Sequence, residues 1–283
     1  MTGGETSARR VAVLGLGLIG GSLARALSER ARDLTIIGWS PSLGERGQAL
    51  EEGVVQAAPT AWEEAVEEAD VVVLAMPLEA CLRVLPELAG LTGPNTTLTD
   101  VASLKAPLMH VARTSGLTDR WVGGHPMAGS EGSGFRHARA TLFDGARVWL
   151  TMDGAGKRHV ERVRALWRSA GADPRDIDAD EHDRSMALVS QLPQLVANAL
   201  AAELAGRGVA TETLGPGGRD MTRLAASPSG MWLDLFRHAP EGLPAALRGV
   251  AGTLETTAAA LESRDLDRLE ALMRETRAWK EGA

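Results

Sequence analysis

The sequence predicts an α/β fold in which an N-terminal doubly wound parallel sheet is followed by an all-helical C-terminal domain. Up to about residue 170, short apolar runs alternate with amphipathic segments of helical spacing, the pattern of a parallel sheet covered by helices. Beyond about residue 172 no strand pattern is found, and long helical segments follow. We therefore expect two domains, residues 1–172 and 173–283, as the length of 283 residues also favours.

The expected strands are short apolar runs, and the first helices lie between them. The near-continuous apolar run from Val71 to Met76 is typical of a strand buried on both faces. Segments 20–31 and 78–88 have the spacing of helices that cover such a sheet. The strands are expected at Val11–Leu14, Leu34–Trp39, Val71–Met76, Thr97–Val101 and Trp121–Gly123.

The C-terminal part is expected to form helices at 181–204, 230–238, 243–263 and 266–279, several of them separated by loops with Gly or Pro. On a helical wheel at about 100° per residue, one side of segment 181–204 is apolar. That side carries Met186, Val189, Leu192, Val196, Leu200 and Leu204, and the other carries Asp183, Ser190, Gln191, Gln194 and Asn198. Neutral amides and a hydroxyl favour a polar pocket or a subunit contact over a merely polar surface.

Composition excludes several classes of protein. The net charge of −7 argues against attraction to nucleic acid or to an anionic membrane. The apolar runs are too short to span a bilayer, and the polar N-terminus shows no signal peptide, so we expect a cytoplasmic protein. The single cysteine, Cys81, excludes an intrachain disulfide. No metal site is expected, because His182 and Asp183 are merely adjacent and lack the spacing of metal ligands.

A glycine motif follows the first expected strand. Gly15-Leu-Gly17-Leu18-Ile19-Gly20 leaves Val11–Leu14 and enters a helix, the context that gives a G-x-G-x-x-G pattern its specificity for dinucleotides. The first glycine permits a tight turn, the second lets a pyrophosphate approach the backbone, and the third allows close helix–strand packing. An ordinary glycine-rich turn is the alternative. The motif predicts a Rossmann-type domain with cofactor contacts at Gly15, Gly17, Leu18, Ile19 and Gly20, and at Ser40, Met76 and Pro77 where the next strands end.

The end of the second expected strand leaves the choice between NAD and NADP open. An acidic residue about twenty positions after the glycines usually binds the ribose 2′-hydroxyl of NAD. Ser40 stands where that carboxylate would be, so a 2′-phosphate is not repelled by it. Arg46 is the nearest downstream cation, unless it is simply a solvated helix residue.

A histidine motif follows the fifth expected strand. In Gly123-Gly124-His125-Pro126, the histidine would lie at the carboxyl edge of the sheet, beside the cofactor crevice. Histidine suits proton transfer near neutral pH. A loop histidine that only hydrogen-bonds the backbone is the alternative, but the flanking glycines and the location favour function.

Four motifs together resemble prephenate/arogenate dehydrogenases. They are the dinucleotide turn, Asp100-Val-Ala-Ser103-Leu-Lys105, His125-Pro-Met-Ala-Gly, and Gly218-Arg-Asp-Met-Thr-Arg223, in that order. The resemblance covers roughly residues 10–280. It implies oxidation and decarboxylation of a cyclohexadienol, prephenate in the first instance, on the route to tyrosine. It also implies a nicotinamide cofactor and a homodimer built through the helical domain.

By this resemblance, three residues would act around the ring hydroxyl of the substrate. His125 would accept the hydroxyl proton, and Ser103 would orient that histidine, although Ser103 could also be a helix N-cap before Lys105. Glu131 resembles a gating carboxylate at the pocket mouth, with a solvated loop acid as the alternative.

Carboxylate recognition is expected from the helical domain, because prephenate carries two carboxylates and an arginine fork can bind one of them bidentately. The resemblance favours Arg223 as this clamp, with Asp220 and Thr222 in support. Arg219 shares its face if the stretch is helical, and a surface arginine pair is the alternative. Trp232 matches a position near the pocket, although a core tryptophan explains it equally well.

One departure from the family leaves the substrate open. The family often has histidines where this chain has Gln191 and Gln194, and glutamine cannot become cationic. We therefore expect this chain to bind the substrate side chain through different contacts from those of the family. Arogenate and a 4-amino analogue of prephenate are the alternative substrates. Two other functions are alternatives: a catalytically silent dinucleotide sensor, which would not need His125, Ser103 and Arg223, and a β-hydroxyacid or imine-reducing enzyme. The latter families use a catalytic lysine or aspartate, and no comparable lysine is identified.

Overall fold

The computed structural model describes residues 8–130 and 132–282. The chain divides into two compact units. The first comprises Met1–Met186 and Ser227–Ala239, and the second comprises Ala187–Ala226 and Pro240–Ala283. Within the described residues, none of the helices combines the length and the apolar character needed to cross a bilayer.

The first unit contains a doubly wound sheet, as the sequence predicts. β1 (Arg10–Leu14) pairs in parallel with β2 (Thr35–Trp39) on one side and with β3 (Val71–Leu74) on the other. β4 (Thr97–Asp100) and β5 (Trp121–Pro126) extend the parallel sheet beyond β3. The chain therefore reverses direction along the sheet at β1, and the crevice outside the carboxyl ends of β1 and β3 is the switch point where such folds bind ligands.

Two further strands, which the apolar pattern of the sequence does not predict, complete the sheet on the β5 side. β6 (Arg147–Thr151) runs antiparallel to β5, and β7 (Asp173–Asp176) pairs in parallel with β6. The strand pattern thus does not stop at residue 172. β7 has the sequence Asp-Pro-Arg-Asp, which shows no apolar run because it forms the sheet edge, where proline and exposed charges are tolerated.

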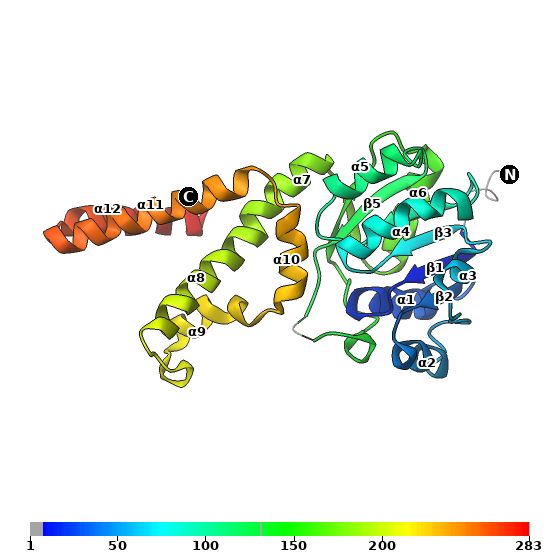
Figure 1. The fold of residues 1–283 in the computed structure, drawn as a ribbon, viewed down its shortest axis with the longest axis horizontal. Coiled ribbons are helices and arrows are strands. Elements are labelled where there is room, and N and C mark those ends of the chain that lie inside the picture. Colours follow the sequence, from blue (N-terminus) through cyan, green and yellow to red (C-terminus); the bar gives the residue numbers. More distant parts are fainter. Residues whose placement is uncertain (1–7, 131, 283) are drawn as a thin grey trace. The chain divides into compact units, whose positions relative to one another are not determined.

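Both faces of the sheet are covered, because successive residues of a strand point to opposite sides. Val11 and Val13 of β1 join one core cluster, and Ala12 and Leu14 join the other. The first cluster includes side chains of α1 (Leu18–Arg30) and α6 (Lys157–Ser169), and the second includes side chains of α4 (Leu78–Leu91) and α5 (Ala106–Thr114). Figure 1 shows these four helices around the strands.

Shorter elements complete the first unit. They are α2 (Leu43–Glu51), α3 (Trp62–Val66), η1 (Phe135–His137), α7 (Ala179–Met186) and α10 (Ser229–Arg237). Leu235 of α10 is buried in the same cluster as α4 and α5, which explains why a helix from late in the chain belongs to this unit.

The second unit is helical throughout its regular structure. It consists of η2 (Ala187–Gln191), α8 (Leu192–Gly206), η3 (Thr211–Thr213), α9 (Pro216–Thr222), η4 (Arg223–Ala226), α11 (Gly242–Ser263) and α12 (Leu266–Glu281). α11 ends where Arg264 takes a left-handed conformation with φ of 57°, and Asp265 caps α12 by accepting a hydrogen bond from the Arg268 amide at 3.1 Å. The two helices lie side by side in Figure 1.

The single helix expected over residues 181–204 is interrupted. Residues 187–191 form a π-helical turn, and Pro193 lies in the first turn of α8. A wider turn changes the angle between side chains before and after it, so the regular wheel fails there. Val189, expected on the apolar side, is 60% exposed, whereas Gln191 and Gln194 from the polar side are buried.

Candidate functional site

The glycine turn between β1 and α1 has room for backbone and for little else. Gly15 has φ of +112°, and a Cβ on it would lie 2.2 Å from the carbonyl oxygen of Ala75. A Cβ on Gly20 would lie 1.9 Å from the oxygen of Gly15, so both positions exclude a side chain. At Gly17 no heavy atom lies within 4 Å of an added Cβ. The turn is therefore tight at its first and third glycines and open at the second, where a pyrophosphate would approach.

The N-terminus of α1 fits an anionic group. Gly17 is the N-cap residue and supplies no side-chain hydrogen bond, and no acidic residue lies in the first turn. The amides of Leu18, Ile19 and Gly20 are among the helix's first donors, which have no partner within the helix. These amides and the positive end of the helix dipole are suited to a pyrophosphate. The residues present therefore fit a dinucleotide.

The remaining expected cofactor residues lie where neighbouring strands end. Ser40 directly follows β2 and is 1% exposed, and Met76 and Pro77 lie between β3 and α4. The Gly15 amide donates to the Trp39 carbonyl oxygen at 2.7 Å, and the Ala75 amide donates to the Leu14 oxygen at 2.7 Å. Both strand ends are thereby tied to the glycine turn.

His125 lies inside β5, opposite Trp149 of β6, and not in the loop after the strand. Its Nδ1 is 2.9 Å from Nε2 of His182 in α7, and the two rings pack edge to face with centroids 5.1 Å apart. Nδ1 of His182 is in turn 2.7 Å from Oδ1 of Asp183. The three side chains form a hydrogen-bonded chain that ends on a carboxylate.

Asp183 also holds the start of α5. Its Oδ1 accepts from the Lys105 amide and its Oδ2 from the Ala106 amide, both at 2.8 Å. The carboxylate thus caps α5 from a segment 77 residues away and is fixed in place by the helix. Because carboxylate oxygens only accept, Nδ1 of His182 carries the proton.

This proton assignment continues to His125. Neutral His182 offers Nε2 as an acceptor, so Nδ1 of His125 donates to it. The unprotonated nitrogen of His125 is then Nε2, which no residue in the described part of the chain hydrogen-bonds. The arrangement presents Nε2 of His125 as a proton acceptor.

A buried ion pair lies beneath the histidine. Lys105 and Asp100 have fully buried side chains that pair with each other, and Lys105 Nζ also donates to the Gly124 oxygen at 2.6 Å. Glycine is required at both positions before the histidine. A Cβ on Gly123 would lie 2.4 Å from Thr151 Oγ1, and a Cβ on Gly124 would lie 2.6 Å from the backbone carbonyl oxygen of Asp100. The glycines before His125 therefore serve packing.

These surroundings keep His125 neutral. Burial lowers the pKa of His125 well below its usual 6.5, and the positive charge of Lys105 lowers it further. For Asp100, burial raises the pKa, and the neighbouring ammonium of Lys105 opposes this rise. An imidazole that stays unprotonated at neutral pH can act as a base.

Ser103 lies in the loop between β4 and α5 and is half-buried. The alternative of a helix N-cap is wrong for this serine, because α5 begins at Ala106 with Lys105 in the N-cap position and the Asp183 carboxylate on its amides. The loop places Ser103 after the end of β4, the strand next to the one that carries His125.

Two of the expected substrate residues are buried glutamines of the second unit. Gln191 is 2% exposed and Gln194 is 1% exposed. Nε2 of Gln194 donates to the Leu224 carbonyl oxygen at 2.8 Å and to Asn198 Oδ1 at 3.2 Å, which fixes the orientation of the amide. The Oε1 atoms of both glutamines are buried and lack a hydrogen-bond partner within the described residues.

Arg223, the expected carboxylate clamp, is next in the chain to a residue that binds Gln194. Arg223 begins η4 and directly precedes Leu224, whose carbonyl oxygen binds Gln194. Arg223 is exposed, and no described residue hydrogen-bonds its guanidinium. Arg219 Nε instead donates to the Leu214 oxygen at 2.8 Å, and Asp220 is exposed. Of the two arginines, Arg223 is the one whose whole guanidinium is available to a carboxylate.

Trp232 belongs to the first unit and packs against its core on the α4 side. Its ring stacks on Phe236 with centroids 5.7 Å apart, and its Nε1 is buried without a partner among the described residues. Glu131, the expected gating carboxylate, lies outside the residues that the structure describes.

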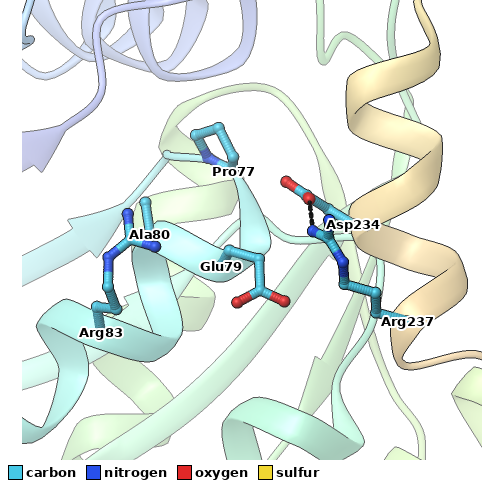
Figure 2. A pocket seen from close by; sticks show the side chains of 6 residues that line it. All are labelled: Pro77, Glu79, Ala80, Arg83, Asp234 and Arg237. Carbon is cyan, nitrogen blue, oxygen red and sulfur yellow. Dashed lines mark hydrogen bonds and ion pairs between the residues drawn. The ribbon is translucent and has the colours of Figure 1, made fainter.

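A shallow pocket of about 450 Å³ lies between α4 and α10 of the first unit (Figure 2). It is lined by Pro77, Glu79, Ala80, Arg83, Asp234 and Arg237. Asp234 and Arg237 pair at 2.6 Å, and Glu79 Oε1 is 2.9 Å from Nε2 of His238, which ties the end of α10 to α4. The pocket shares Pro77 with the expected cofactor site, and His125 does not line it.

Sequence reasoning missed the residues that support His125. His182 and Asp183 lack the spacing of metal ligands, and Asp183 is expected only on the polar side of segment 181–204, while nothing in the Lys105 motif predicts a buried charge. The available signal was Asp100 at the end of an otherwise uncharged strand, five positions before one of only three lysines in the chain. A buried carboxylate requires a buried partner.

The glycine turn at the switch point of a doubly wound sheet defines a Rossmann-type dinucleotide-binding protein, and a neutral histidine beside that edge is typical of a dehydrogenase. Family models agree. The model described as "Prephenate dehydrogenase, nucleotide-binding domain" matches residues 23–174, and "Prephenate dehydrogenase, dimerization domain" matches residues 178–275. The chain belongs to the prephenate dehydrogenase family of oxidoreductases.

Individual relatives show the extent of the likeness. The prephenate dehydrogenase of Bacillus subtilis is 35% identical over 81% of this chain, which spans 63% of that relative's length. The cyclohexadienyl dehydrogenase of Zymomonas mobilis is 30% identical over 92% of this chain and 91% of its own. The crystal structure of prephenate dehydrogenase from Aquifex aeolicus, in complex with hydroxyphenyl propionate and NAD+, superposes with a TM-score of 0.88 at 27% identity and covers 97% of this chain and 98% of that one.

Proposed function

We propose that this chain catalyses the oxidative decarboxylation of prephenate to 4-hydroxyphenylpyruvate with a nicotinamide dinucleotide as hydride acceptor. The observation that carries the proposal is the hydrogen-bonded chain from His125 through His182 to Asp183, which presents Nε2 of a neutral histidine as a base. A catalytically silent dinucleotide sensor would not need these three hydrogen-bonded side chains, and the enzymatic relatives support activity.

The proposed reaction uses one base and one electrophile. A dinucleotide held by its pyrophosphate at the glycine turn would supply its nicotinamide ring as acceptor for the hydride that leaves the ring carbon bearing the hydroxyl. His125 accepts the hydroxyl proton at Nε2 as the carbonyl develops. Loss of the ring carboxylate as carbon dioxide returns its electron pair to the ring, which becomes aromatic, and the phenol oxygen takes the proton back. His125 therefore ends the cycle neutral.

Residues of the second unit are proposed to bind the rest of the substrate. Arg223 is available to a carboxylate, and arginine binds carboxylates bidentately. Arg219 and Asp220 are proposed in supporting roles, with Ser103 orienting the ring hydroxyl. The cofactor contacts are proposed at the glycine turn and at Ser40, Met76 and Pro77.

Arogenate is the second candidate substrate, and one observation favours it. Arogenate carries an ammonium group where prephenate carries a keto group. The buried, unpartnered Oε1 atoms of Gln191 and Gln194 are acceptors, which an ammonium donor would satisfy and a keto oxygen would not.

We also propose that the chain is a homodimer built through its helical part. The match to a dimerization domain over residues 178–275 supports this assembly. α11 and α12 expose large apolar side chains that a subunit contact would cover: Leu254, Leu261, Leu266, Met273 and Trp279 are each at least 60% exposed. Light scattering on the purified protein should give twice the mass of the 29.8 kDa chain, and a monomer at micromolar concentration would contradict the proposal.

The test of function is absorbance at the reduced-nicotinamide band with prephenate or arogenate and each of NAD and NADP. Reduction with either substrate supports the reaction class, and the ratio of kcat/KM values identifies the substrate. Confirmed cofactor binding with no reduction in any pairing would contradict both substrate proposals and leave the 4-amino analogue for the same assay.

A further inference from the structure

A carboxylate is fixed at the end of β2, although the residue at the strand end itself is a serine. Ser40 Oγ donates to Glu45 Oε2 at 2.5 Å, and Ser40 is almost fully buried beneath this contact. Glu45 lies in the first turn of α2 and is partly exposed. The acidic group that the sequence lacks at position 40 is thus supplied five positions later, through the Ser40 hydroxyl.

Three interactions hold the Glu45 carboxylate in this position. Its other oxygen, Oε1, accepts from the Phe135 amide at 3.3 Å. Its own backbone amide donates to Ser42 Oγ at 3.3 Å, the N-cap bond of α2. A carboxylate in the first turn is also stabilised by the helix dipole. Each oxygen retains a lone pair, so the group can still accept from a ligand hydroxyl.

The neighbouring arginine is not available to a phosphate. Arg46 is 7% exposed, and its Nη1 donates to the carbonyl oxygens of Ser40 at 3.0 Å and Thr60 at 3.3 Å. These bonds turn the guanidinium into the protein, where it ties α2 to the chain after β2. The cation that the sequence offered for a 2′-phosphate therefore has a structural role.

The position of Ser40 relative to the glycine turn connects these contacts to the cofactor. Gly15 donates its amide to the carbonyl oxygen of Trp39, the residue before Ser40. In Rossmann-type domains the group at this strand end faces the adenine ribose, and a carboxylate there accepts from the 2′-hydroxyl and repels a 2′-phosphate. We propose that Glu45, held by Ser40, is the residue that makes this chain prefer NAD over NADP.

The proposal rests on the proposed function only through dinucleotide binding, so its test measures binding without substrate. The dissociation constants of NADH and NADPH are measured by nicotinamide fluorescence on the full-length protein. Because a like charge at contact distance disfavours the phosphate, the wild type should bind NADH at least roughly tenfold more tightly than NADPH. Raising the salt concentration should reduce the ratio of the NADPH dissociation constant to the NADH dissociation constant.

The variant Glu45→Gln keeps the side-chain length and removes the charge; its amide oxygen can accept from the Phe135 amide while its NH2 group donates to Ser40 Oγ. It should narrow the ratio roughly tenfold, mainly by tightening NADPH binding. Glu51→Gln, an exposed position on the same helix, is the matched control and should leave the ratio unchanged. Ser40→Asp should restore the preference in a Glu45→Gln background, because it places the carboxylate directly at the strand end.

Two results would overturn the proposal. One is a wild type that binds NADPH as tightly as NADH, which would point to a cation such as the exposed Arg136 of η1. The other is a Glu45→Gln ratio equal to that of the wild type. Failure to bind either dinucleotide would contradict the cofactor assignment of the whole protein, and this outcome differs from loss of preference alone.

Discussion

Nδ1 of His125 lies 2.9 Å from Nε2 of His182, and this contact joins two residues 57 positions apart in the chain. Asp183 fixes the proton on the far side of His182, so the contact determines which nitrogen of His125 is basic. Asp183 is itself fixed by the amides that begin α5. The basicity of one atom in β5 is therefore set by the start of a helix.

His125→Asn should lower kcat by at least about a hundredfold, because general-base catalysis contributes roughly 10² to 10⁴. Asparagine retains a hydrogen bond to His182 and cannot take up a proton. The dissociation constant of NADH should change less than about threefold, since the glycine turn is untouched. Near-normal turnover would remove His125 from its proposed role.

His182→Ala should lower kcat by roughly ten- to a hundredfold with little change in KM, since the base is still present but its tautomer is no longer fixed. The interaction with His182 is also one of the causes of the low pKa of His125, so without it the acid limb of the kcat profile should move to higher pH. A purely structural role would not move that limb. His110→Ala, at an exposed histidine of α5, is the control and should leave both quantities unchanged.

The pH profile of the wild type tests the state of His125 directly. Because burial and Lys105 hold the pKa of His125 well below 6.5, the base remains neutral as the pH falls from 8 through 6.5. The value of kcat/KM should therefore stay level across this interval and decline only in more acidic solution. A decline centred at 6.5 would show an ordinary histidine and contradict the proposed environment.

Lys105→Met should destabilise the fold by about 3–5 kcal/mol at neutral pH, the usual cost of leaving one partner of a buried pair uncompensated. Burial already raises the pKa of Asp100, and loss of the ammonium raises it further. A carboxyl with a raised folded pKa is stabilised by protonation, so the destabilisation should shrink as the pH falls from 8 to 5. Urea unfolding of the wild type and the variant at both pH values measures the difference in unfolding free energy, and Lys157→Met, at an exposed position, is the control.

The sequence predicted the parts of the fold that depend on local pattern. Gly15 and Gly20 mark the turn between β1 and α1 because a Cβ at either position would clash with the backbone, and Gly17 marks the open position between them. The apolar run at Val71 likewise identifies a central strand. The apolar pattern does not predict β7, because an edge strand such as Asp173–Asp176 needs no apolar run.

The arrangement of the candidate site can be predicted from the sequence only in part, because it depends on long-range contacts. The motif around His125 pointed to a base, but nothing near it in the sequence indicates His182 as its partner. The sequence also does not indicate Glu45. The lack of a carboxylate at Ser40 is evident from the sequence, but the hydrogen bond between Ser40 and Glu45 depends on where α2 begins. Spacing predicts elements, whereas side-chain partners depend on how the elements pack.

A second buried histidine should make the stability of the fold depend on pH. Arg158 Nε donates to Nε2 of His159 at 3.1 Å, so the proton lies on Nδ1, which is 2.7 Å from Thr97 Oγ1 and donates to it. Burial, with the charges of Arg158 and Arg162, lowers the pKa of His159 from 6.5 to about 4. The folded state therefore binds fewer protons than the unfolded state between these two values.

It follows that His159 costs no stability above pH 6.5, that stability falls as the pH drops from 6.5 to about 4, and that the loss levels off below this range. At pH 4.5 the loss from this residue should be about 2 kcal/mol relative to pH 7. His159→Gln keeps a donor and an acceptor without titrating, so its unfolding free energy should depend less on pH by that amount. Urea unfolding of both proteins at the two pH values gives the difference, and identical pH dependence would show that His159 titrates normally in the fold.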